Sequence, residues 1–578
     1  MTALSPITRE LIRNALVTIA DNMLVTVIRT SRSTVVKVNL DFSASICDAQ
    51  GQMVAQGLSL PSHLGATMPA LKGCLEEFEE DINPGDILAS NDPYSGASHL
   101  NDVFMFKPIY KAGERIAFVG LTLHHTDMGG RVPGGNATDS TEIYQEGLRI
   151  APTKIYDRGQ PNRTLFRIIE KNVRVPNTVL GDIRSQISAL NVAEQELQRV
   201  LTDYENDVFK AYMQDLIDYA EARTRAGIAA LPDGEVEFTD WNDDDGTGEG
   251  PIKIHAKMIK KGDEIVVDFT GTSPQMSGAL NPNYWFTASC IYAGIRTALE
   301  LDIPTNAGFY KPLTVIAPEG SWVNPKFPAP FGARGLGGYR IRTMGLGLVA
   351  ELLKGQRPAC PGGSEFAVVY AGYHENGDPF LLLEFHVMTG QGGGPTGDGQ
   401  EGGPYCLGNV ANVPVEVIEA ENPVLVEEYS LLPDTGGPGE FRGALGIVRQ
   451  YRFLAKRGTV QLRSDRKYHQ PWGLEGGGCG APGNIIRNPS DNAEEQPSKF
   501  VSTFKKNEVL RGEMPGSGGW GDPLKRDTTR VAEDIRQEKI SAAHAEEVYG
   551  VIVDPDTFMV NEVKTLSTRA VMRKDRQI

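Results

Sequence analysis

Three of the nine histidines in this chain lie in two short polar segments that also contain aspartates. The first segment, SNDPYSGASHLND, carries His99 and Asp102, and the second, LTLHHTDMGG, carries His124 and His125. Imidazole and carboxylate groups gathered in this way can bind zinc, manganese or iron(II), whereas calcium and magnesium prefer oxygen ligands. A metal centre is therefore the first chemical hypothesis that the sequence suggests.

A β-hairpin would bring the two segments together. The apolar stretches VFMFKPIY and IAFVGLTLHH flank the turn sequence KAGER, and a turn symmetric about Gly113 would place Asp102 opposite His124. Directly opposed residues have Cβ atoms about 4.5–5.5 Å apart, so both side chains could reach one ion. His99 lies three residues before Asp102 and could fold back to the same point.

Each of these residues also has a structural interpretation that involves no metal. HxxD segments on loops are common, and histidine–aspartate pairs often only cap turns. In the expected register the side chain of His125 points to the face of the hairpin opposite His124. It is therefore expected to support the site or to contact substrate at most, and not to bind the metal. A one-residue slip, which a bulge or edge position at Pro108 could cause, would exchange it for His124. Asp127 fits a turn residue better than a general base, although it lies near enough to be considered.

Other residues that could bind a ligand or take part in a reaction fit structural roles at least as well. Arg334, Arg340 and Arg342 could hold an anion or could form salt bridges, and His469 is a lone histidine beside an aromatic residue. The sequence has no GxxxxGK[ST] motif, and its glycine-rich runs do not lie between a plain strand and a helix, which disfavours a nucleotide site. It has neither a GxSxG motif nor a cysteine in a nucleophile motif.

Composition sets the broad class of the protein. At 578 residues the chain is too long for one compact core, and its net charge of -17 argues against nucleic acid as a partner. No run of 18 uninterrupted apolar residues predicts a membrane span, and the N-terminus has no cleavable signal pattern. Six scattered cysteines without a CxxC pair favour a reducing cytoplasm over a disulfide framework or a thiolate zinc site.

Periodicity predicts elements of both kinds. Helices are expected from Ser5-Pro6 to about Ile28, as two or three segments between Leu180 and Leu231, around 284–300, and from Thr528 to Tyr549 before Gly550. Besides the hairpin around Gly113, hairpins are expected where VVKVNLDFSASI and MVAQ flank DAQGQ, and within 252–272. Beyond Pro304, glycine-rich runs such as FGARGLGGYR are expected to form ordered loops around a β-rich body.

These elements predict a large α+β fold with several lobes. Its β-hairpins carry the metal site, and its C-terminal half is a β body rich in glycine loops. We expect an N-terminal part over 1–231 with the first helix, the metal-binding hairpins and the helical segment. A β-rich body over 232–525 and a C-terminal helix and tail over 526–578 would follow.

Long ordered motifs resemble the hydantoinase B family over nearly the whole chain. They are DFSASICDAQGQMVAQG, SNDPYSGASHLNDV, HHTDMGG, FTGTSPQMSGALNPN, LLPDTGGPGEFRGALG, and GSGGWGDPLKRD followed by YGVIVD. Members of that family include the B subunits of N-methylhydantoinases and caprolactamase, portions of 5-oxoprolinases, and subunits of acetone and acetophenone carboxylases. The resemblance implies that the whole chain is one family module.

The resemblance also implies a site, a cofactor and a partner. It assigns Asp41, His99, Asp102 and His124 as metal ligands and catalytic residues, and Asp41 is chosen by the resemblance alone. The implied metal is divalent, with zinc as the first expectation and manganese or iron as the second. ATP would be used by a partner subunit, an actin-like ATPase of hydantoinase A type, in a hetero-oligomer such as (αβ)2.

The implied activity is ATP-dependent opening of a lactam or hydantoin ring in the cytoplasm. The partner would phosphorylate the amide, and this chain would use its metal and water to open the ring, as in caprolactamase or N-methylhydantoinase. One alternative is a subunit of an ATP-dependent ketone carboxylase, for which the same ligands would serve. A second alternative is a non-catalytic scaffold for the ATPase subunit. Nothing in the residues selects the size of the ring.

Overall fold

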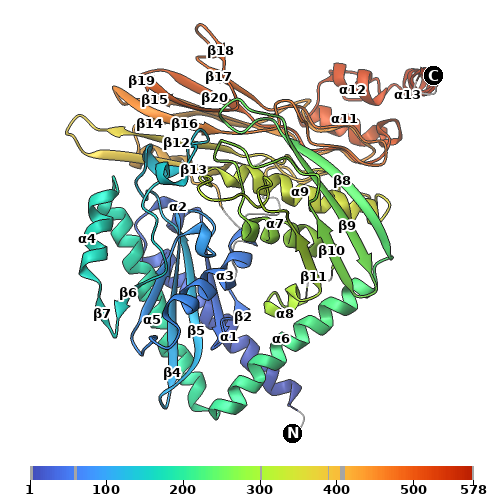
Figure 1. The fold of residues 1–578 in the computed structure, drawn as a ribbon. Helices are drawn as coiled ribbons and strands as arrows, with labels where there is room; N and C mark the ends of the chain where they lie inside the picture. The colour runs from blue at the N-terminus through green and yellow to red at the C-terminus, as the bar shows by residue number, and fades with distance from the viewer. Residues whose placement is uncertain (1–3, 58–60, 300–301, 388, 404–410, 576–578) are drawn as a thin grey trace.

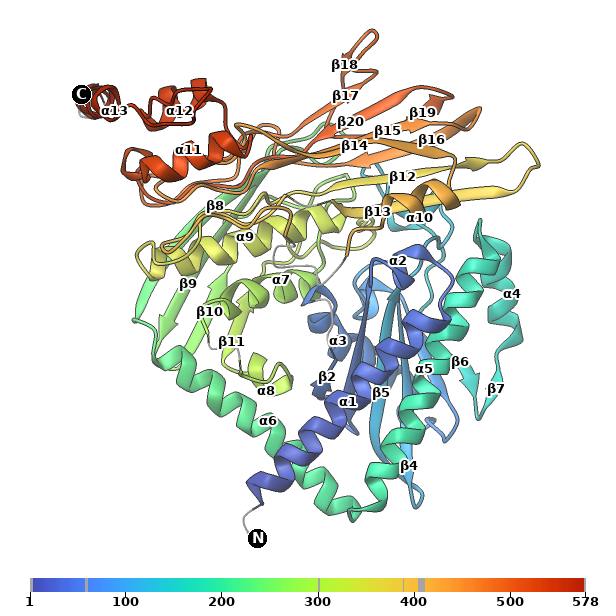
Figure 2. The ribbon, with the colours of Figure 1, turned by 180° about the vertical axis from the view of Figure 1, so that it is seen from behind.

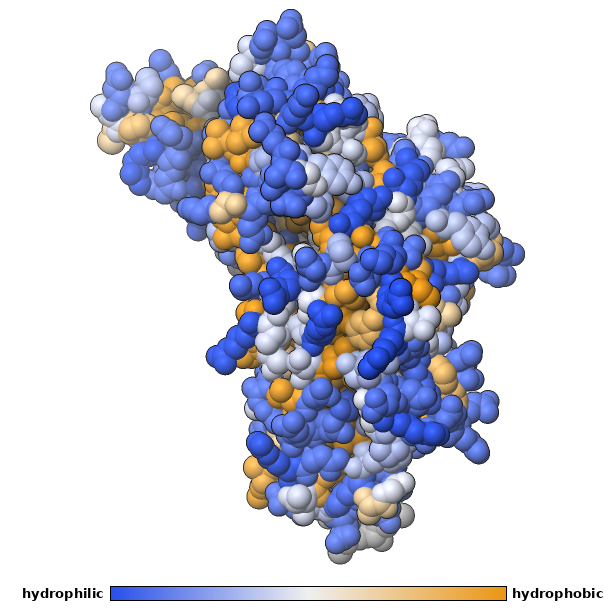
Figure 3. Space-filling view, turned by 90° about the vertical axis from the view of Figure 1, so that its left-hand side faces the viewer, coloured by the Kyte–Doolittle hydropathy of each residue, from blue (hydrophilic) through white to orange (hydrophobic). Residues whose placement is uncertain are grey.

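The computed structural model of the protein describes residues 4–57, 61–299, 302–387, 389–403 and 411–575 (Figure 1). Helices and separate sheets form a mixed α+β fold with several lobes, as the sequence predicted. Figure 3 views the side on which α4 and the β12–β13 hairpin lie. Hydrophilic residues cover most of that face, and hydrophobic residues show mainly toward its middle.

A seven-stranded sheet with the order β2-β1-β5-β4-β3-β6-β7 forms the N-terminal lobe. One face of its central strands shares a hydrophobic core with α1 and α5, and the other face packs with α3 (Figure 2). The strands are β1 (Phe42–Asp48), β2 (Met53–Gln56), β3 (Ile87–Ser90), β4 (Asp102–Lys111), β5 (Glu114–His124), β6 (Thr153–Asp157) and β7 (Gln160–Pro161). The helices are α1 (Pro6–Thr30), α2 (Thr34–Lys37), α3 (Pro61–Phe78), α4 (Arg163–Asn172), α5 (Pro176–Thr202) and α6 (Asn206–Ala229).

A second sheet, with the order β11-β10-β9-β8, packs against two central helices, α7 and α9, around a core of its own. Its strands are β8 (Gly234–Asn242), β9 (Ile252–Lys261), β10 (Glu264–Asp268) and β11 (Leu313–Ile316). The helices of this part are α7 (Tyr284–Arg296), α8 (Ala307–Tyr310) and α9 (Arg334–Leu352).

Two further sheets, β13-β12-β16-β19 and β14-β15-β20-β17-β18, enclose a third core and form the C-terminal β body. The strands are β12 (Phe366–Tyr373), β13 (Pro379–Val387), β14 (Val424–Leu432), β15 (Gly446–Phe453), β16 (Arg457–Arg463), β17 (Asn484–Arg487), β18 (Glu494–Glu495), β19 (Lys499–Lys505) and β20 (Val509–Glu513). The helices are α10 (Val415–Glu421), α11 (Thr528–Arg536), α12 (Ala542–Tyr549) and α13 (Glu562–Asp575).

The first helix is confirmed where the sequence predicted it. Ser5 caps α1 by accepting a hydrogen bond from Thr8 N at 3.4 Å, and Pro6 occupies the first turn. Among the described residues, α1 alone is long and apolar enough to cross a membrane, but Leu16 and Met23 are fully buried in the core beside α5. One side of α1 is therefore part of the core of the N-terminal lobe.

Several other predictions are confirmed. Helices α5 and α6 fill the predicted helical segment, β9 and β10 form the predicted hairpin within 252–272, and α7 lies where a helix was expected. The glycine-rich runs around 434–443, 473–483 and 516–522 are loops around the C-terminal β body. Close packing there depends on glycine, since a Cβ on Gly516 would lie 1.8 Å from Thr435 O.

Two helices lie between Thr34 and Leu123, where the sequence patterns predicted only hairpins. Ser33 caps the short helix α2 by accepting a hydrogen bond from Val36 N at 3.4 Å, and the strand begins only after Leu40 has turned the chain with φ 64°. Asp41 therefore precedes strand β1 and does not follow a strand. The second helix is α3, whose burial against the sheet decides its conformation.

The predicted centre of the turn between β4 and β5 is wrong, although the predicted pairing of Asp102 with His124 is right. Ala112 and Gly113 form a two-residue turn, and both have positive φ (51° and 84°), as in a type I′ turn. A bulge next to Pro108 adds one residue to β5. It restores the alignment in which Asp102 faces His124.

The prediction of an ordered loop for FGARGLGGYR is wrong, because most of this run lies in helix α9. Glycine lowers helix propensity, but here it lets α7 and α9 approach closely. A Cβ on Gly345 would lie 2.9 Å from the Cα of Gly294, and one on Gly337 would lie 2.7 Å from the ring of Trp322. The tertiary packing of this core therefore outweighs the local preference for a loop.

The single helix predicted over 528–549 is in fact two helices, α11 and α12. Glu538 adopts a positive φ of 57° between them, and Ser541 caps α12 by accepting a hydrogen bond from His544 N at 3.0 Å. Gly550 ends α12 with a φ of 61°, as the sequence predicted. Helix α13 occupies part of the segment that was expected to be a tail.

A matched pair of substitutions tests the close crossing of α7 and α9. Gly345→Ala should lower the free energy of unfolding by about 1–3 kcal/mol, because the added methyl group meets backbone atoms of Gly294. Gly227→Ala in α6 should raise it by up to about 1 kcal/mol, since its Cβ would lie 3.4 Å from Leu299 at ordinary contact distance. Denaturant unfolding measures both, and equal stabilisation by the two variants would contradict the crossing.

Candidate metal centre

Three neighbouring strands bring predicted site residues to one end of the seven-stranded sheet. Asp102 at the start of β4 pairs with His124 at the end of β5, which confirms the predicted pairing. Phe42 of β1 pairs with Leu123, and His124 N donates a hydrogen bond to Asp41 O at 3.1 Å. Because adjacent strands lie about 4.8 Å apart, the register alone sets Asp41, His124 and Asp102 in a row.

The alternation of side chains along the strands decides which histidine joins this row. The core residues on the two faces show that even positions of β4 and β5 point toward α3, so Asp102 and His124 share that face. His125 follows on the opposite face, as expected. Burial lowers the pKa of His125 there, and its neighbours are Asp182 and Gln186 of α5.

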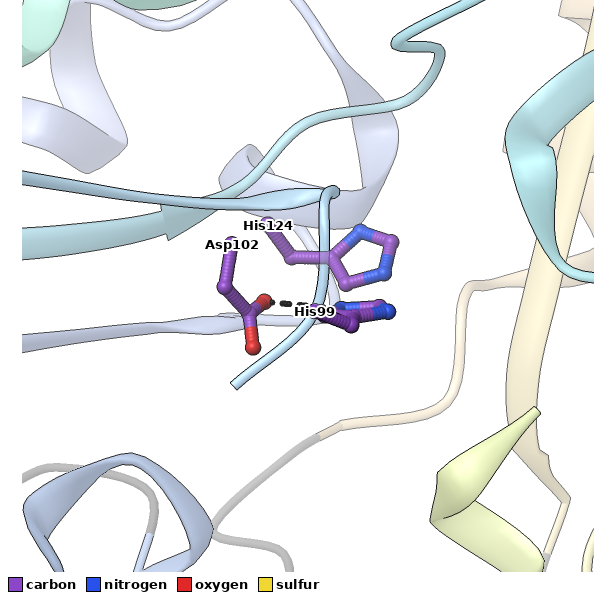
Figure 4. Close-up of side chains that lie close together, drawn as sticks. All are labelled: His99, Asp102 and His124. Atoms are coloured by element: carbon purple, nitrogen blue, oxygen red, sulfur yellow. Dashed lines mark ion pairs between the residues drawn. The ribbon is translucent and has the colours of Figure 1, made fainter. Parts of the chain in front are cut away.

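His99, Asp102 and His124 form a compact buried group (Figure 4). One potential ligand atom from each side chain lies within 4.8 Å of the other two. His99 Nε2 lies 3.1 Å from Asp102 Oδ1, and the ring centroids of His99 and His124 are 5.0 Å apart. Asp102 N donates to His99 O at 3.1 Å, which closes the turn that returns His99 to the start of β4.

Unsatisfied polar atoms show that this group fits a metal ion. Nδ1 of His99 and Nδ1 of His124 are buried without a hydrogen bond to any described residue, and His99 Nε2 and Asp102 Oδ1 have only each other, 3.1 Å apart. Leaving such atoms without partners costs roughly 1–3 kcal/mol each, so a buried cluster of them calls for an explanation. Two imidazoles and a carboxylate are a donor set that zinc, manganese and iron(II) accept.

The protonation of both histidines also fits metal binding. Burial, reinforced by the nearby charge of Arg334, lowers the pKa of His99 to about 3. Burial lowers the pKa of His124 to about 4, although Asp41 and Asp102 act in the opposite direction. Both rings are therefore neutral at physiological pH, and a neutral imidazole offers the lone pair that a metal requires.

Asp102 is held in place by cationic and neutral donors. Arg334 Nη2 of α9 lies 2.6 Å from Asp102 Oδ2, and Ser98 Oγ donates to the same oxygen. Burial by itself would raise the pKa of Asp102, but its contacts with His99, His63 and Arg334 lower it well below its ordinary value. With His99 neutral, the Arg334 guanidinium is the fixed positive charge among these partners. The carboxylate is thus ionised, with Oδ2 occupied and Oδ1 turned toward His99.

His63 of α3 lies at this site and was missed in the sequence. Its Nε2 lies 3.5 Å from Asp41 Oδ1 and 3.6 Å from Asp102 Oδ2, and its Nδ1 lies 3.1 Å from Ser43 Oγ. The carboxylate of Asp41 is not part of the compact group of three, and it reaches the site beside His63. His63 lies outside the hairpins that the sequence predicted, and the proline-serine pair before it is a local signal of a helix start.

Elements of the C-terminal β body cover His124. Phe385 of β13 packs edge-on against the imidazole with ring centroids 5.5 Å apart, and the guanidinium of Arg463 lies 4.5 Å from the centre of the Phe385 ring. Arg463 donates to Glu365 Oε1 at 2.7 Å and to Asn136 Oδ1 at 3.0 Å. The site therefore lies where the N-terminal lobe meets the β body, and strand packing limits the access of water.

The remaining candidates from the sequence lie outside this group, and Asp127, Arg340 and His469 have structural partners. Asp127 accepts hydrogen bonds from Gly134 N at 3.0 Å and from Arg174 N at 2.6 Å, as a turn residue does. Arg340 pairs with Asp465 at 2.5 Å. His469 stacks on Trp241 and lies 2.9 Å from Asp243 Oδ1, and Arg342 is buried in α9. Of the three arginines considered, Arg334 is the one that reaches the candidate metal centre.

A buried carboxyl group orients the turn before α9. Glu146 Oε1 accepts hydrogen bonds from Phe331 N at 2.8 Å and from Gly332 N at 2.6 Å, two residues before Arg334. Burial raises the pKa of Glu146 to about 8, although both hydrogen bonds and Arg334 act against this shift. Glu146 is therefore largely protonated in the folded protein near neutral pH.

Comparison with known proteins connects this geometry to a family. The family model described as hydantoinase B/oxoprolinase matches residues 5–523. The chain is 31% identical to the putative D-/L-hydantoinase B subunit of Pseudomonas sp. (strain NS671), with 98% of each chain covered. It is also 31% identical to the beta subunit of the caprolactamase of Pseudomonas jessenii, with 99% of this chain and 100% of the relative covered.

Solved structures and longer relatives extend the comparison. The crystal structure of the ATP-dependent caprolactamase from Pseudomonas jessenii matches with a TM-score of 0.92 at 29% identity, over 98% of this chain and 100% of that chain. A nucleotide-free acetone carboxylase shares the fold, with a TM-score of 0.92 at 20% identity over 99% of this chain and 83% of that chain. The 5-oxoprolinase of Dictyostelium discoideum is 30% identical over 90% of this chain, which spans 40% of that relative.

Replacing Glu146 should change how stability depends on pH. A carboxyl group whose pKa is raised from 4.5 to about 8 on folding stabilises the protein fully below pH 4.5, and this contribution is lost as pH rises toward 8. Glu146→Gln keeps an oxygen that accepts both hydrogen bonds but cannot ionise. The variant should match the wild type near pH 4 and exceed its melting temperature increasingly from pH 5 to about pH 8, above which the difference should stay constant. A difference independent of pH would contradict the raised pKa.

Proposed function

Because this chain belongs to the hydantoinase B/oxoprolinase family, we propose that it is the hydrolytic subunit of a two-component, ATP-dependent cyclic amidase. Its substrate is a lactam or a hydantoin, as in caprolactamase or N-methylhydantoinase. The observation that carries this proposal is the buried group of His99, Asp102 and His124, whose potential ligand atoms lie within 4.8 Å of one another. Relatives named as hydantoinase and caprolactamase subunits support the substrate class.

The metal in this proposal is zinc, with manganese or iron(II) as the next choice. His99, Asp102 and His124 would hold it. Asp41, which lies beside His124 at the β1 end of the row, would be the fourth ligand. When bound, a divalent ion of this kind polarises a carbonyl oxygen and lowers the pKa of water toward neutrality. The two carboxylates of Asp41 and Asp102 would balance the two positive charges of the ion, and the two neutral histidines would add no charge.

The other residues around the site orient the ligands. Arg334 occupies Asp102 Oδ2 and so directs Oδ1 toward the point where His99 and His124 converge. His63 lies between the carboxylates of Asp41 and Asp102 and fixes their separation. Such support limits the movement of ligands, which is what precise positioning of the reacting groups requires.

A partner protein supplies the activation that the ring requires. An unstrained cyclic amide is a poor electrophile, so phosphorylation of its oxygen with ATP makes the ring carbon reactive. The sequence of this chain has no phosphate loop, and its relatives are named as B or beta subunits. We therefore assign ATP to an actin-like subunit of hydantoinase A type in a hetero-oligomer such as (αβ)2. The free thiols of the described cysteines fit a reducing cytoplasm.

The metal assignment predicts the metal content of variants. His99→Ala and His124→Ala should each reduce bound metal from about one ion per chain by at least about 10-fold, because each removes one of the few ligands. His469→Ala is the matched control, since His469 lies outside the site, and it should keep the full content. Elemental analysis of the purified proteins measures the ratio. Full metal content in both site variants would remove the basis of the proposed mechanism.

Product analysis tests the reaction class. The complex of this chain with its A-type subunit should convert lactams or hydantoins with ATP into ring-opened acids, and it should incorporate no label from bicarbonate. Labelled carbon in an acid formed from a ketone would identify a carboxylase in its place. ATP hydrolysis by the partner without any change in the organic substrate would indicate a scaffold.

A further inference from the structure

We propose that helix α13 is a docking surface for the separate ATPase subunit. This inference rests on the proposed function, because it takes from it the identity of the partner. The C-terminal segment after 526 forms a small helical arm of α11, α12 and α13. Figures 1 and 2 show α12 and α13 projecting from the β body, with the C-terminus at the tip.

The base of the arm is anchored firmly to the β body. Arg526 is 1% exposed and binds both carboxylate oxygens of Asp398, at 2.6 and 2.9 Å, as well as Asp534 of α11 at 2.7 Å. Val531, Tyr549 and neighbouring side chains form a separate hydrophobic core within the arm. The arm is therefore an ordered extension and can present a preformed surface.

One face of α13 is fixed to this arm. Thr565 is buried and accepts a hydrogen bond from Ile552 N at 3.0 Å. Arg569 donates to Tyr549 O at 2.9 Å and to Arg526 O at 2.7 Å. These contacts set the rotation of the helix about its axis, so the opposite face must point to solvent.

That opposite side carries several exposed apolar residues, beside Ser567 and Lys574. Val563, Leu566 and Ala570 recur at the spacing of one helix face, and Met559 lies just before the helix. Val563 is 79% exposed, Leu566 is 68% exposed and Met559 is 69% exposed. A cluster of large exposed apolar side chains on an ordered helix is typical of an interaction surface.

The comparison of relatives indicates what covers this face. The family model ends at residue 523, just before the arm begins, and the longer 5-oxoprolinase matches only 90% of this chain. The caprolactamase and hydantoinase relatives named as subunits match 98–99% of it. The arm thus accompanies chains that are separate subunits, where a second polypeptide must be held by contacts alone.

A second copy of this chain fits the surface less well. The described part of α13 carries Lys564, Arg569, Arg573 and Lys574 against Glu562 and Asp575. Two such helices would repel each other in a symmetric pair. We therefore assign the exposed apolar residues of α13 to an apolar groove on the A-type subunit.

The test compares the binding of the purified A-type subunit to variants of the full-length chain. The double variant Val563→Glu/Leu566→Glu should weaken binding at least about 30-fold, because buried anchor residues of an interface typically contribute about 2 kcal/mol or more. Both residues are exposed and lie far from the metal centre, so metal content and melting temperature should not change. Lys564→Glu is the matched control, since it adds negative charge on another face, and it should change binding less than about 3-fold.

Each alternative result has a distinct meaning. Equal affinity of the double variant and the wild type would overturn the assignment of α13 and leave the proposed function intact. A wild-type chain that holds metal but binds no A-type subunit would overturn the two-component function itself. A wild-type chain that dimerises alone, and whose dimer the double variant disrupts, would assign the face to a second copy.

Discussion

The register of three adjacent strands is the constraint on which the candidate site depends. Asp41, His124 and Asp102 come from positions far apart in the chain, and the pairing of β1 with β5 and of β5 with β4 sets them side by side. Side chains alternate between the faces of a sheet, so a slip of one residue would move His124 to the α5 face and bring His125 in its place. The bulge beside Pro108 is thus part of the site, because it corrects the register that the tight turn alone would impose.

Burial of unbonded polar atoms is the second constraint. An enclosed group of two neutral imidazoles and an ionised carboxylate is unfavourable unless something binds its free atoms. Arg334 binds Oδ2 of Asp102 and leaves Oδ1 turned toward His99 Nε2 at 3.1 Å, so the ion pair does not complete the site. The packing of Phe385 and Arg463 around the site excludes water and so strengthens the electrostatic interactions of the charges inside it.

The wrong predictions of secondary structure share one physical cause. The glycine-rich run before and within α9 has low helix propensity, and it is helical because only glycine allows α7 to cross so closely at Gly294 and Gly345. Likewise α3 carries His63, but its residues offer weak helix signals, and burial against the sheet decides its conformation. Local preferences of about 1 kcal/mol per residue are overridden wherever a helix fills a core.

The sequence by itself determined which groups could do chemistry. Histidine and aspartate types, their spacing of three residues and the hairpin pattern placed His99, Asp102 and His124 at one end of a hairpin. The facing of Asp102 and His124 depends in addition on the bulge after Ile109, because the two-residue turn alone would impose another register. These features are local, and hairpin pairing follows from neighbouring residues. Only the tertiary structure decided that His63 and Arg334 join the site, because they arrive from α3 and α9 through long-range packing that no local pattern encodes. Contacts between distant segments depend on how all the cores pack together, and that information belongs to the folded chain as a whole.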